Sequence, residues 1–486
     1  MSAPASNGRW GTTRRVAPAA RPAAPRGLPA ISGHQNALDG IRAIAALAVL
    51  VYHVAGSSGA LHRGGLGWLY NGGQIGVPIF FTLSGLLLYR PWAAAVLDPD
   101  RPRPSTRSYL RKRAFRILPA YWAVVICFMV TAGLDHVTDA FSWVSLLTLT
   151  HTYVPDPWWG STLGPAHLGQ IWSLTVEAAW YLTLPATAAV LAWYARRAPS
   201  GDVGARARRL LRGLAVYAVL SFAYTAAMFI PQPQPMMGLW LPRFFAWFAI
   251  GMALAVVTVW ARLEPDGPVP RLCRTVAGSW RACWAGAALL YVIGATPATG
   301  PLDLVTLDVV WTSMLEILVN GLCAAAFVAP AALASERDAV IGTVLGNPVM
   351  RFLGRISYSV FLWQMLIVVG WYEWTGRTFR GDVMTDLPLL LAATIAAATA
   401  SYYLVERPAQ RLARPRRDRD RDRRPPAPEP DREPEPRPGQ GPEQAREPET
   451  AEPAAPAPPS STRSTLPDLP AERGGDATAE RPPGRG

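Results

Sequence analysis

The sequence predicts an all-α polytopic membrane protein with about ten transmembrane helices and disordered tails at both ends. Half of its 486 residues are hydrophobic, and nearly all long apolar runs lie between residues 38 and 405. Arginines gather in the short segments between these runs, which is typical of loops that fix the orientation of a membrane protein. The two ends are instead rich in Pro, Ala, Arg, Asp and Glu. Such segments bury too little apolar surface to offset the entropy lost on ordering.

Ten apolar runs are long enough to cross a bilayer as helices, which takes roughly 20 residues. An eleventh run, near residues 140–154, is shorter, and neither it nor its flanks carry Lys or Arg. The ten segments predicted to span the membrane are 38–56, 74–92, 114–133, 170–194, 213–231, 239–260, 282–298, 309–332, 352–372 and 386–405.

The distribution of arginine decides whether the 140–154 run crosses. The first 26 residues and residues 101–113 are both strongly basic, so both are expected in the cytoplasm. A third basic cluster, residues 196–212, faces inward only if the 140–154 run does not cross. We therefore expect that run to be an interfacial or re-entrant outer segment. Both termini of this plasma-membrane protein are then cytoplasmic.

The predicted organisation has three parts. Residues 1–35 form a disordered cytoplasmic segment, residues 36–408 a membrane domain, and residues 409–486 a disordered cytoplasmic tail rich in Pro, Arg and Glu. The net charge of +13 does not indicate nucleic-acid binding, because the arginines follow the membrane topology. The four cysteines form no CxxC pair, and the sequence predicts no metal site.

Arg42 and His53 lie inside the first apolar run, on one face of the same helix. Eleven residues separate them, which is three turns and ~20°, or ~16 Å along the axis. Ionisable groups in lipid are costly and normally face a protein interior or a wet cavity. Imidazole titrates near neutral pH, so His53 is the candidate catalytic proton acceptor and Arg42 a candidate substrate-binding cation. The alternative is a histidine that only bonds a neighbouring helix.

Two more arginines, Arg113 and Arg116, are three residues apart at the start of the third predicted span. They share a helix face and can grip phosphate through their planar guanidinium groups. The alternative is that both belong to the ordinary positive charge of a cytoplasmic loop. This alternative is stronger for Arg113, because Arg116 lies deeper in the predicted span.

Glu177 and Arg243 complete the candidate set. Glu177 lies about eight residues into its span and can orient His53 in catalysis or pair with Arg243. Arg243, at the outer end of the 239–260 span, is a candidate substrate-binding residue, although snorkelling to the interface is an alternative. Glu406, beside Arg407, is expected to form a structural pair at a helix end, and Glu316 has no assigned role.

Six segments, in this order, resemble the integral-membrane acyltransferase family 3, bacterial enzymes that decorate sugars and other hydroxyl compounds. The resemblance covers about residues 36–408. Two positions depart from the family's pattern, because many members carry Asp in place of Pro78 and His in place of Gln364. The segments are 38–42 with His53, 76–85, 113–122 with its Arg-x-x-Arg, 172–177, 354–359 and 403–408.

The resemblance implies an O-acyltransferase with no bound cofactor. It moves an acyl group, by default acetyl, from cytoplasmic acyl-CoA to a hydroxyl of a cell-envelope carbohydrate or a secreted metabolite. His53 and the arginines are then essential, either through direct transfer or through an acyl-histidine intermediate. Two other classes remain open from the residues alone: a transporter or flippase for a glycan or lipid-linked sugar, and a membrane scaffold. The buried charges argue against the scaffold.

Overall fold

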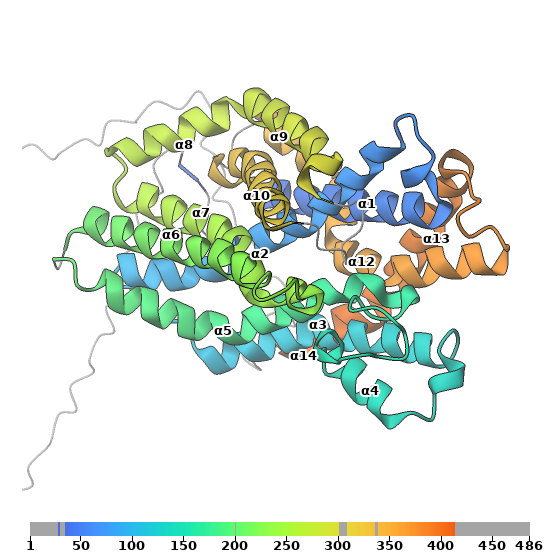
Figure 1. Ribbon diagram of the computed structural model, residues 1–486. Helices are drawn as coiled ribbons and strands as arrows, with labels where there is room; N and C mark the ends of the chain where they lie inside the picture. The colour runs from blue at the N-terminus through green and yellow to red at the C-terminus, as the bar shows by residue number, and fades with distance from the viewer. Residues whose placement is uncertain (1–27, 30–34, 200, 301–308, 336–338, 414–486) are drawn as a thin grey trace, which may run out of the picture. The chain divides into compact units, whose positions relative to one another are not determined.

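The computed structural model of this protein describes residues 28–29, 35–199, 201–300, 309–335 and 339–413. Most of the two segments predicted to be disordered, 1–35 and 409–486, lies outside these residues. The described part contains helices and one isolated bridge between Pro29 and Ser335, but no strand. The all-α class is therefore confirmed (Figure 1).

Each of the ten segments predicted to span the membrane coincides with a helix. Shorter α-helices and 3-10 turns connect them. The α-helices are α1 Asn36–Ser58, α2 Gly76–Leu97, α3 Thr106–Met129, α4 Ala140–Leu147, α5 Trp172–Ala195, α6 Val203–Ala227, α7 Phe245–Leu263, α8 Pro268–Gly278, α9 Trp280–Ala295, α10 Val310–Leu333, α11 Ala339–Leu345, α12 Pro348–Trp374, α13 Val383–Ser401 and α14 Arg407–Ala413.

Eight helices of the described chain are long and apolar enough to cross a membrane, or nine if α8 and α9, bent by 66°, count as one span. Ten were expected, and the helix missing from the count of nine is α3. This helix has 24 residues, ~36 Å, but its first turns carry the cluster from Arg107 to Arg116. These charges keep its mean hydropathy low, while its second half is as apolar as a span.

The 140–154 run does not span. It contains α4, which has eight residues and is therefore ~12 Å long, followed by a 3-10 turn at residues 151–153. Asp139 caps α4 by accepting hydrogen bonds from the backbone N–H groups of Phe141 and Ser142. The hydroxyl of Ser142 also donates to this carboxylate and, with those caps, holds the pKa of Asp139 below its usual value. A helix this short agrees with the expected non-spanning segment.

Close helix packing in the centre depends on glycine. The most extensive contact of α2 is with α7, and the most extensive contact of α1 is with α12. A Cβ at Gly251 of α7 would overlap the carbonyl oxygen of Thr82, and one at Gly354 of α12 would overlap the backbone of Asp39. Small residues allow membrane helices to approach this closely. The two contacts fix α1 and α2, which carry much of the site.

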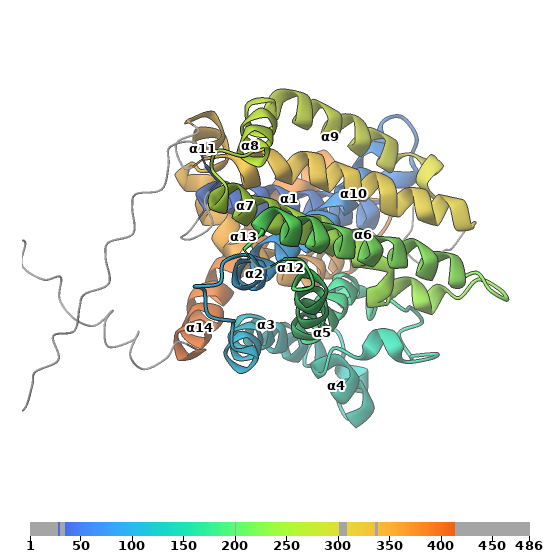
Figure 2. The ribbon, with the colours of Figure 1, turned by 90° about the vertical axis from the view of Figure 1, so that its left-hand side faces the viewer.

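An aromatic stack ties α2 to α5 through α7. The ring of Phe248 stacks on Phe81 with centroids 4.6 Å apart and on Trp180 with centroids 4.4 Å apart. On the other side of α5, α3 lies between α5 and α14 (Figure 2). A π-helical turn, Tyr402–Glu406, joins α13 to α14. Glu406 is thereby placed beside α3.

Candidate functional site

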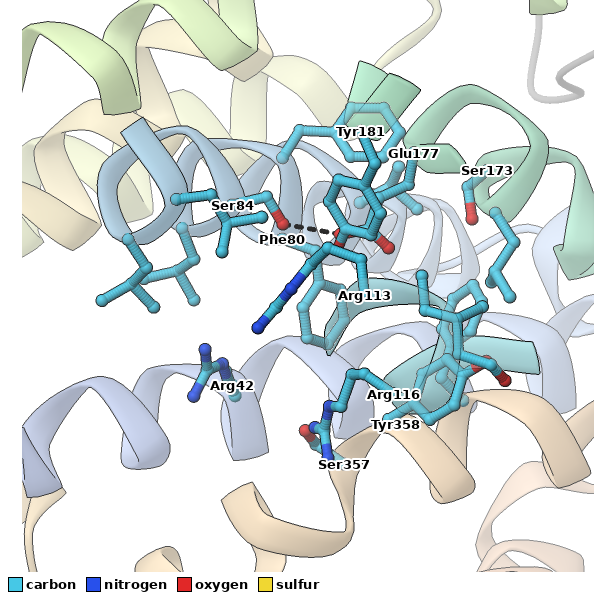
Figure 3. Close-up of a pocket in the computed structure, with 18 residues that line it drawn as sticks. Arg42, Phe80, Ser84, Arg113, Arg116, Ser173, Glu177, Tyr181, Ser357 and Tyr358 are labelled. Atoms are coloured by element: carbon cyan, nitrogen blue, oxygen red, sulfur yellow. Dashed lines mark hydrogen bonds between the residues drawn. The ribbon is translucent and has the colours of Figure 1, made fainter. Parts of the chain in front are cut away.

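Three of the predicted arginines line one cavity, which we call the arginine pocket. Its volume is about 110 Å³, and Figure 3 shows Arg42, Arg113 and Arg116 around it. Glu177 lines the same cavity. The structure thus brings together four of the six residues singled out from the sequence. The walls come from α1, α2, α3, α5 and α12, with Val77, Phe80, Ser84, Tyr181, Ser357, Tyr358 and Phe361 among the other lining residues.

The three arginines differ in their partners. Arg42 pairs with Asp39 one turn earlier on α1, at 3.2 Å. Arg116 pairs with Glu406, which is fully buried and also accepts a hydrogen bond from Ser359. Arg113 has no carboxylate partner in the described chain, and its Nε is buried without a hydrogen bond. Arg113 is therefore the cation most available to an incoming anion. The structural pair expected for Glu406 exists, but its cation is Arg116.

Glu177 has different partners from those expected. Its carboxylate accepts hydrogen bonds from the hydroxyls of Ser84 and Tyr181, both at 2.6 Å (Figure 3). Of the two roles left open for Glu177, the pairing with Arg243 is excluded, because Arg243 pairs with another carboxylate. Glu177 also lines a different cavity from His53. These two hydrogen bonds therefore orient the carboxylate of Glu177 within the arginine pocket.

His53 lines a second, smaller cavity of about 40 Å³, which we call the histidine pocket. Its Nδ1 is buried and has no hydrogen-bond partner in the described chain, whereas the side chain of Gln364 interacts with the imidazole. Pro78 lines this pocket as well. The two positions that depart from the family's pattern are thus both neighbours of His53. Three amide side chains also line this pocket: Gln74, Gln170 and Asn320.

Arg243 and Glu316 meet at the histidine pocket. Their ion pair measures 2.6 Å, and Arg243 also donates to the carbonyl of Gly238 at 3.1 Å. Arg243 is only 5% exposed, so it does not snorkel to the interface. The role of Glu316 was missed from the sequence. Its carboxylate lies in the middle of an apolar run, which was a signal of a functional or paired residue. The partner could not be identified, because Arg243 is 73 residues away in the sequence.

The two pockets are neighbours. Val77 of α2 and Phe361 of α12 line both. Arg42 and His53 lie on one face of α1, where Arg42 lines the arginine pocket and His53 lines the histidine pocket. The arrangement offers a pocket lined by three arginines beside a pocket lined by a histidine, and the two share two apolar lining residues.

Tyr181 and Tyr358 also line the arginine pocket and were not singled out from the sequence. The hydroxyl of Tyr358 donates to the carbonyl of Ile117 at 2.8 Å, which holds α12 against α3. Tyrosines are common in membrane helices, so their spacing alone gave no signal. Within the described residues, no group of three or more His, Cys, Asp or Glu side chains is placed to hold a metal ion.

Comparison with known proteins connects this geometry to an activity class. Over 385 residues, 76% of this chain and 54% of the relative, it is 26% identical to YrhL of Bacillus subtilis, provisionally named a peptidoglycan O-acetyltransferase. It is 23% identical to the peptidoglycan O-acetyltransferase OatA of Listeria monocytogenes over 77% of this chain and 55% of OatA. Nodulation protein 10 of Rhizobium leguminosarum is 33% identical over 177 residues, 32% of this chain and 44% of that protein.

The chain spans about half the length of the two acetyltransferase relatives. No solved structure matches it. A family model described as an acyltransferase domain matches residues 35–406. This range holds both pockets and all six candidate residues. The chain therefore belongs to this family of membrane O-acyltransferases, acyltransferase family 3.

Proposed function

We propose that this protein is an acyl-CoA-dependent O-acetyltransferase of the plasma membrane, with both termini in the cytoplasm and with His53 as general base. The observation that carries the proposal is the junction of the arginine pocket and the histidine pocket at Val77 and Phe361. A donor with phosphates and an acceptor with hydroxyls need different surroundings, and the lining of the two neighbouring pockets differs in this way.

The donor side is the arginine pocket. Coenzyme A carries a diphosphate, and guanidinium groups bind phosphate oxygens through charge-assisted hydrogen bonds. Arg113 has no carboxylate to displace, so it binds the diphosphate at the lowest cost, with Arg42 and Arg116 adding positive potential. The ~16 Å between Arg42 and His53 along α1 suits the extended pantetheine arm, which places the thioester near the passage.

The acceptor side is the histidine pocket. Its amide side chains both donate and accept, as sugar hydroxyls require. His53 takes the proton of the acceptor hydroxyl while the oxygen attacks the thioester carbonyl, forming a C–O bond. The C–S bond then breaks, and the departing thiolate receives that proton. This direct transfer is our default, and acylation of His53 before the acceptor is the variant.

The acceptor class follows from the relatives. Two of them are named for O-acetylation of peptidoglycan, so we infer a cell-envelope carbohydrate for this chain. The competing function, a flippase, requires a passage that admits a whole sugar. In the proposed reaction only the acetyl group has to pass the two apolar side chains that the pockets share, Val77 and Phe361, whereas a flippase would have to move the whole sugar past them.

The test uses the protein in lipid nanodiscs with radiolabelled acetyl-CoA and soluble peptidoglycan fragments. His53→Gln keeps the shape of the side chain without the base, and we expect transfer to fall on the order of 10²–10⁴-fold. His62→Gln, at an exposed histidine nine residues later, is the matched control and should keep the wild-type rate. Transport of a labelled glycan by a wild-type protein that transfers no acetyl would overturn the proposal.

A further inference from the structure

A third cavity, which we call the basic groove, takes no part in the chemistry described so far. Its volume is about 410 Å³, and it lies among the last turns of α2, the segment before α3 and the last turns of α5. Its size falls within the roughly 300–1,000 Å³ typical of small-molecule pockets. The arginine pocket, at about 110 Å³, is too small to hold a nucleotide.

The basic groove continues the arginine pocket along the same helices. On α2, Leu88 lines the pocket and Trp92, one turn later, lines the groove. On α5 the same step leads from Tyr181 to Pro185. On α3 the step runs from Arg113 back to Thr106, ~10 Å along the axis. The groove and the arginine pocket therefore lie next to each other along three helices.

Cations without a carboxylate partner lie at the mouth of the groove. Arg103 and Arg196 both line it, and neither forms an ion pair in the described chain. Partial burial, followed by the like charges of Arg103 and Arg206, lowers the pKa of the Arg196 guanidinium. These like charges give the mouth a positive potential, which attracts a phosphate.

The walls of the groove carry two tryptophans, and the guanidinium of Arg197 lies over the ring of Trp193, 3.6 Å from its centroid. Trp92 lines the α2 side of the groove. Trp193 lines the α5 side together with Pro185, Ala188 and Ala192, which precede it on the same helix. Trp92 is held by an edge-to-face contact with Tyr109 of α3, at a centroid distance of 6.2 Å. Aromatic side chains of this kind stack on nucleobases regardless of the base. An aromatic cleft with cations at its mouth matches a nucleoside phosphate.

We propose that the basic groove binds the nucleoside 3′-phosphate end of the acyl-CoA donor, with Arg103 and Arg196 on the phosphate and the base between Trp92 and Trp193. This inference rests on the proposed donor. The diphosphate then stays at Arg113, between a nucleoside in the groove and a thioester directed toward His53. An anionic phospholipid headgroup offers the same phosphate chemistry, and the experiment separates the two sources.

The experiment compares acetyl-CoA with 3′-dephospho-acetyl-CoA as donors, in nanodiscs of phosphatidylcholine alone. We expect the wild-type KM to be about tenfold higher for the dephospho donor, because removal of the phosphate loses its charge-assisted contacts with Arg103 and Arg196. The double variant Arg103→Gln/Arg196→Gln should raise the KM for acetyl-CoA by the same factor and leave the KM for the dephospho donor unchanged. Trp193→Ala, at an exposed side chain, should raise both values.

Arg101→Gln is the matched control. Arg101 lies in the same segment but pairs with Asp98 at 3.2 Å and does not line the groove, so its KM values should stay at wild type. Equal wild-type KM values for the two donors would overturn the proposal while leaving the proposed function intact. A KM that rises in the double variant only when anionic lipid is present would assign the groove to a phospholipid and overturn it too. Absence of transfer from either donor would reject the proposed function, and this inference with it.

Discussion

Arg116 on α3 and Glu406 at the junction of α13 and α14 form an ion pair across 290 residues of sequence, with the carboxylate fully buried. Ser359 and Gln410 donate to the same carboxylate at 3.0 and 2.9 Å. Burial of a charge is costly unless it is paired and hydrogen-bonded, and here both conditions are met. Arg116 therefore has a structural partner besides its place in the arginine pocket.

Glu406→Gln should destabilise the protein, because it leaves Arg116 without its counter-ion. Removal of one member of a buried pair costs about 3–5 kcal/mol, and solvent access to Arg116 lowers this to about 1–3 kcal/mol. The double variant Arg116→Gln/Glu406→Gln should be more stable than Glu406→Gln alone. Thermal unfolding in detergent measures both, and strictly additive losses would show that the pair is not coupled.

Substitutions at Arg113 and at Arg116 should differ in their effects on donor binding and on stability. Arg113→Gln removes a cation that has no ion pair, so we expect the KM for acetyl-CoA to rise about tenfold with an unchanged unfolding temperature. Arg116→Lys keeps the charge and loses the planar fork, so both quantities should change. Steady-state kinetics and thermal unfolding of the same preparations are the measurement. A stable Arg113→Gln with wild-type KM removes Arg113 from the donor site.

Val77 should control passage between the two pockets. Val77→Phe fills the junction with a ring, and we expect acetyl transfer to fall at least tenfold while acetyl-CoA still binds. Val77→Ala is the control and should retain transfer, since it opens the junction. Calorimetric titration with acetyl-CoA, alongside the transfer assay, measures the two effects. Full transfer by Val77→Phe would mean that the acetyl group does not pass there.

The orientation of the chain can be tested by cysteine labelling. In a variant whose four cysteines are replaced by alanine, Asp156→Cys should react with an impermeant maleimide added to intact cells. Arg208→Cys, at an exposed position near the start of α6, should react only after permeabilisation. Labelling of Arg208→Cys in intact cells would place the basic cluster 196–212 outside and contradict the expected topology.

Removal of the C-terminal tail should leave transfer intact, provided that the cut spares α14. The expected tail begins at residue 409, but α14 continues to Ala413, and Arg111 donates to the carbonyl of Ala413 at 2.9 Å. Deletion of residues 416–486 preserves this bond. We expect wild-type kcat and KM in membranes. A loss of activity with normal insertion would assign the tail a role in the reaction.

The sequence was sufficient for the helices because each apolar run must satisfy its own backbone hydrogen bonds in lipid. It also brought out Arg42, Arg113, Arg116 and Glu177, since charges in apolar runs are rare enough to be informative. Partners could not be predicted. Arg243 pairs with Glu316 and Arg116 with Glu406 because α7 meets α10 and α3 meets the end of α13. Such contacts depend on helix packing, which periodicity within one helix does not specify.

The two pockets share two lining side chains, Val77 and Phe361. In the proposed reaction these two residues stand between the donor and the acceptor. An opening there that is wide enough for an acetyl group must still exclude protons and ions, so the bulk of the valine and the phenylalanine serves both requirements.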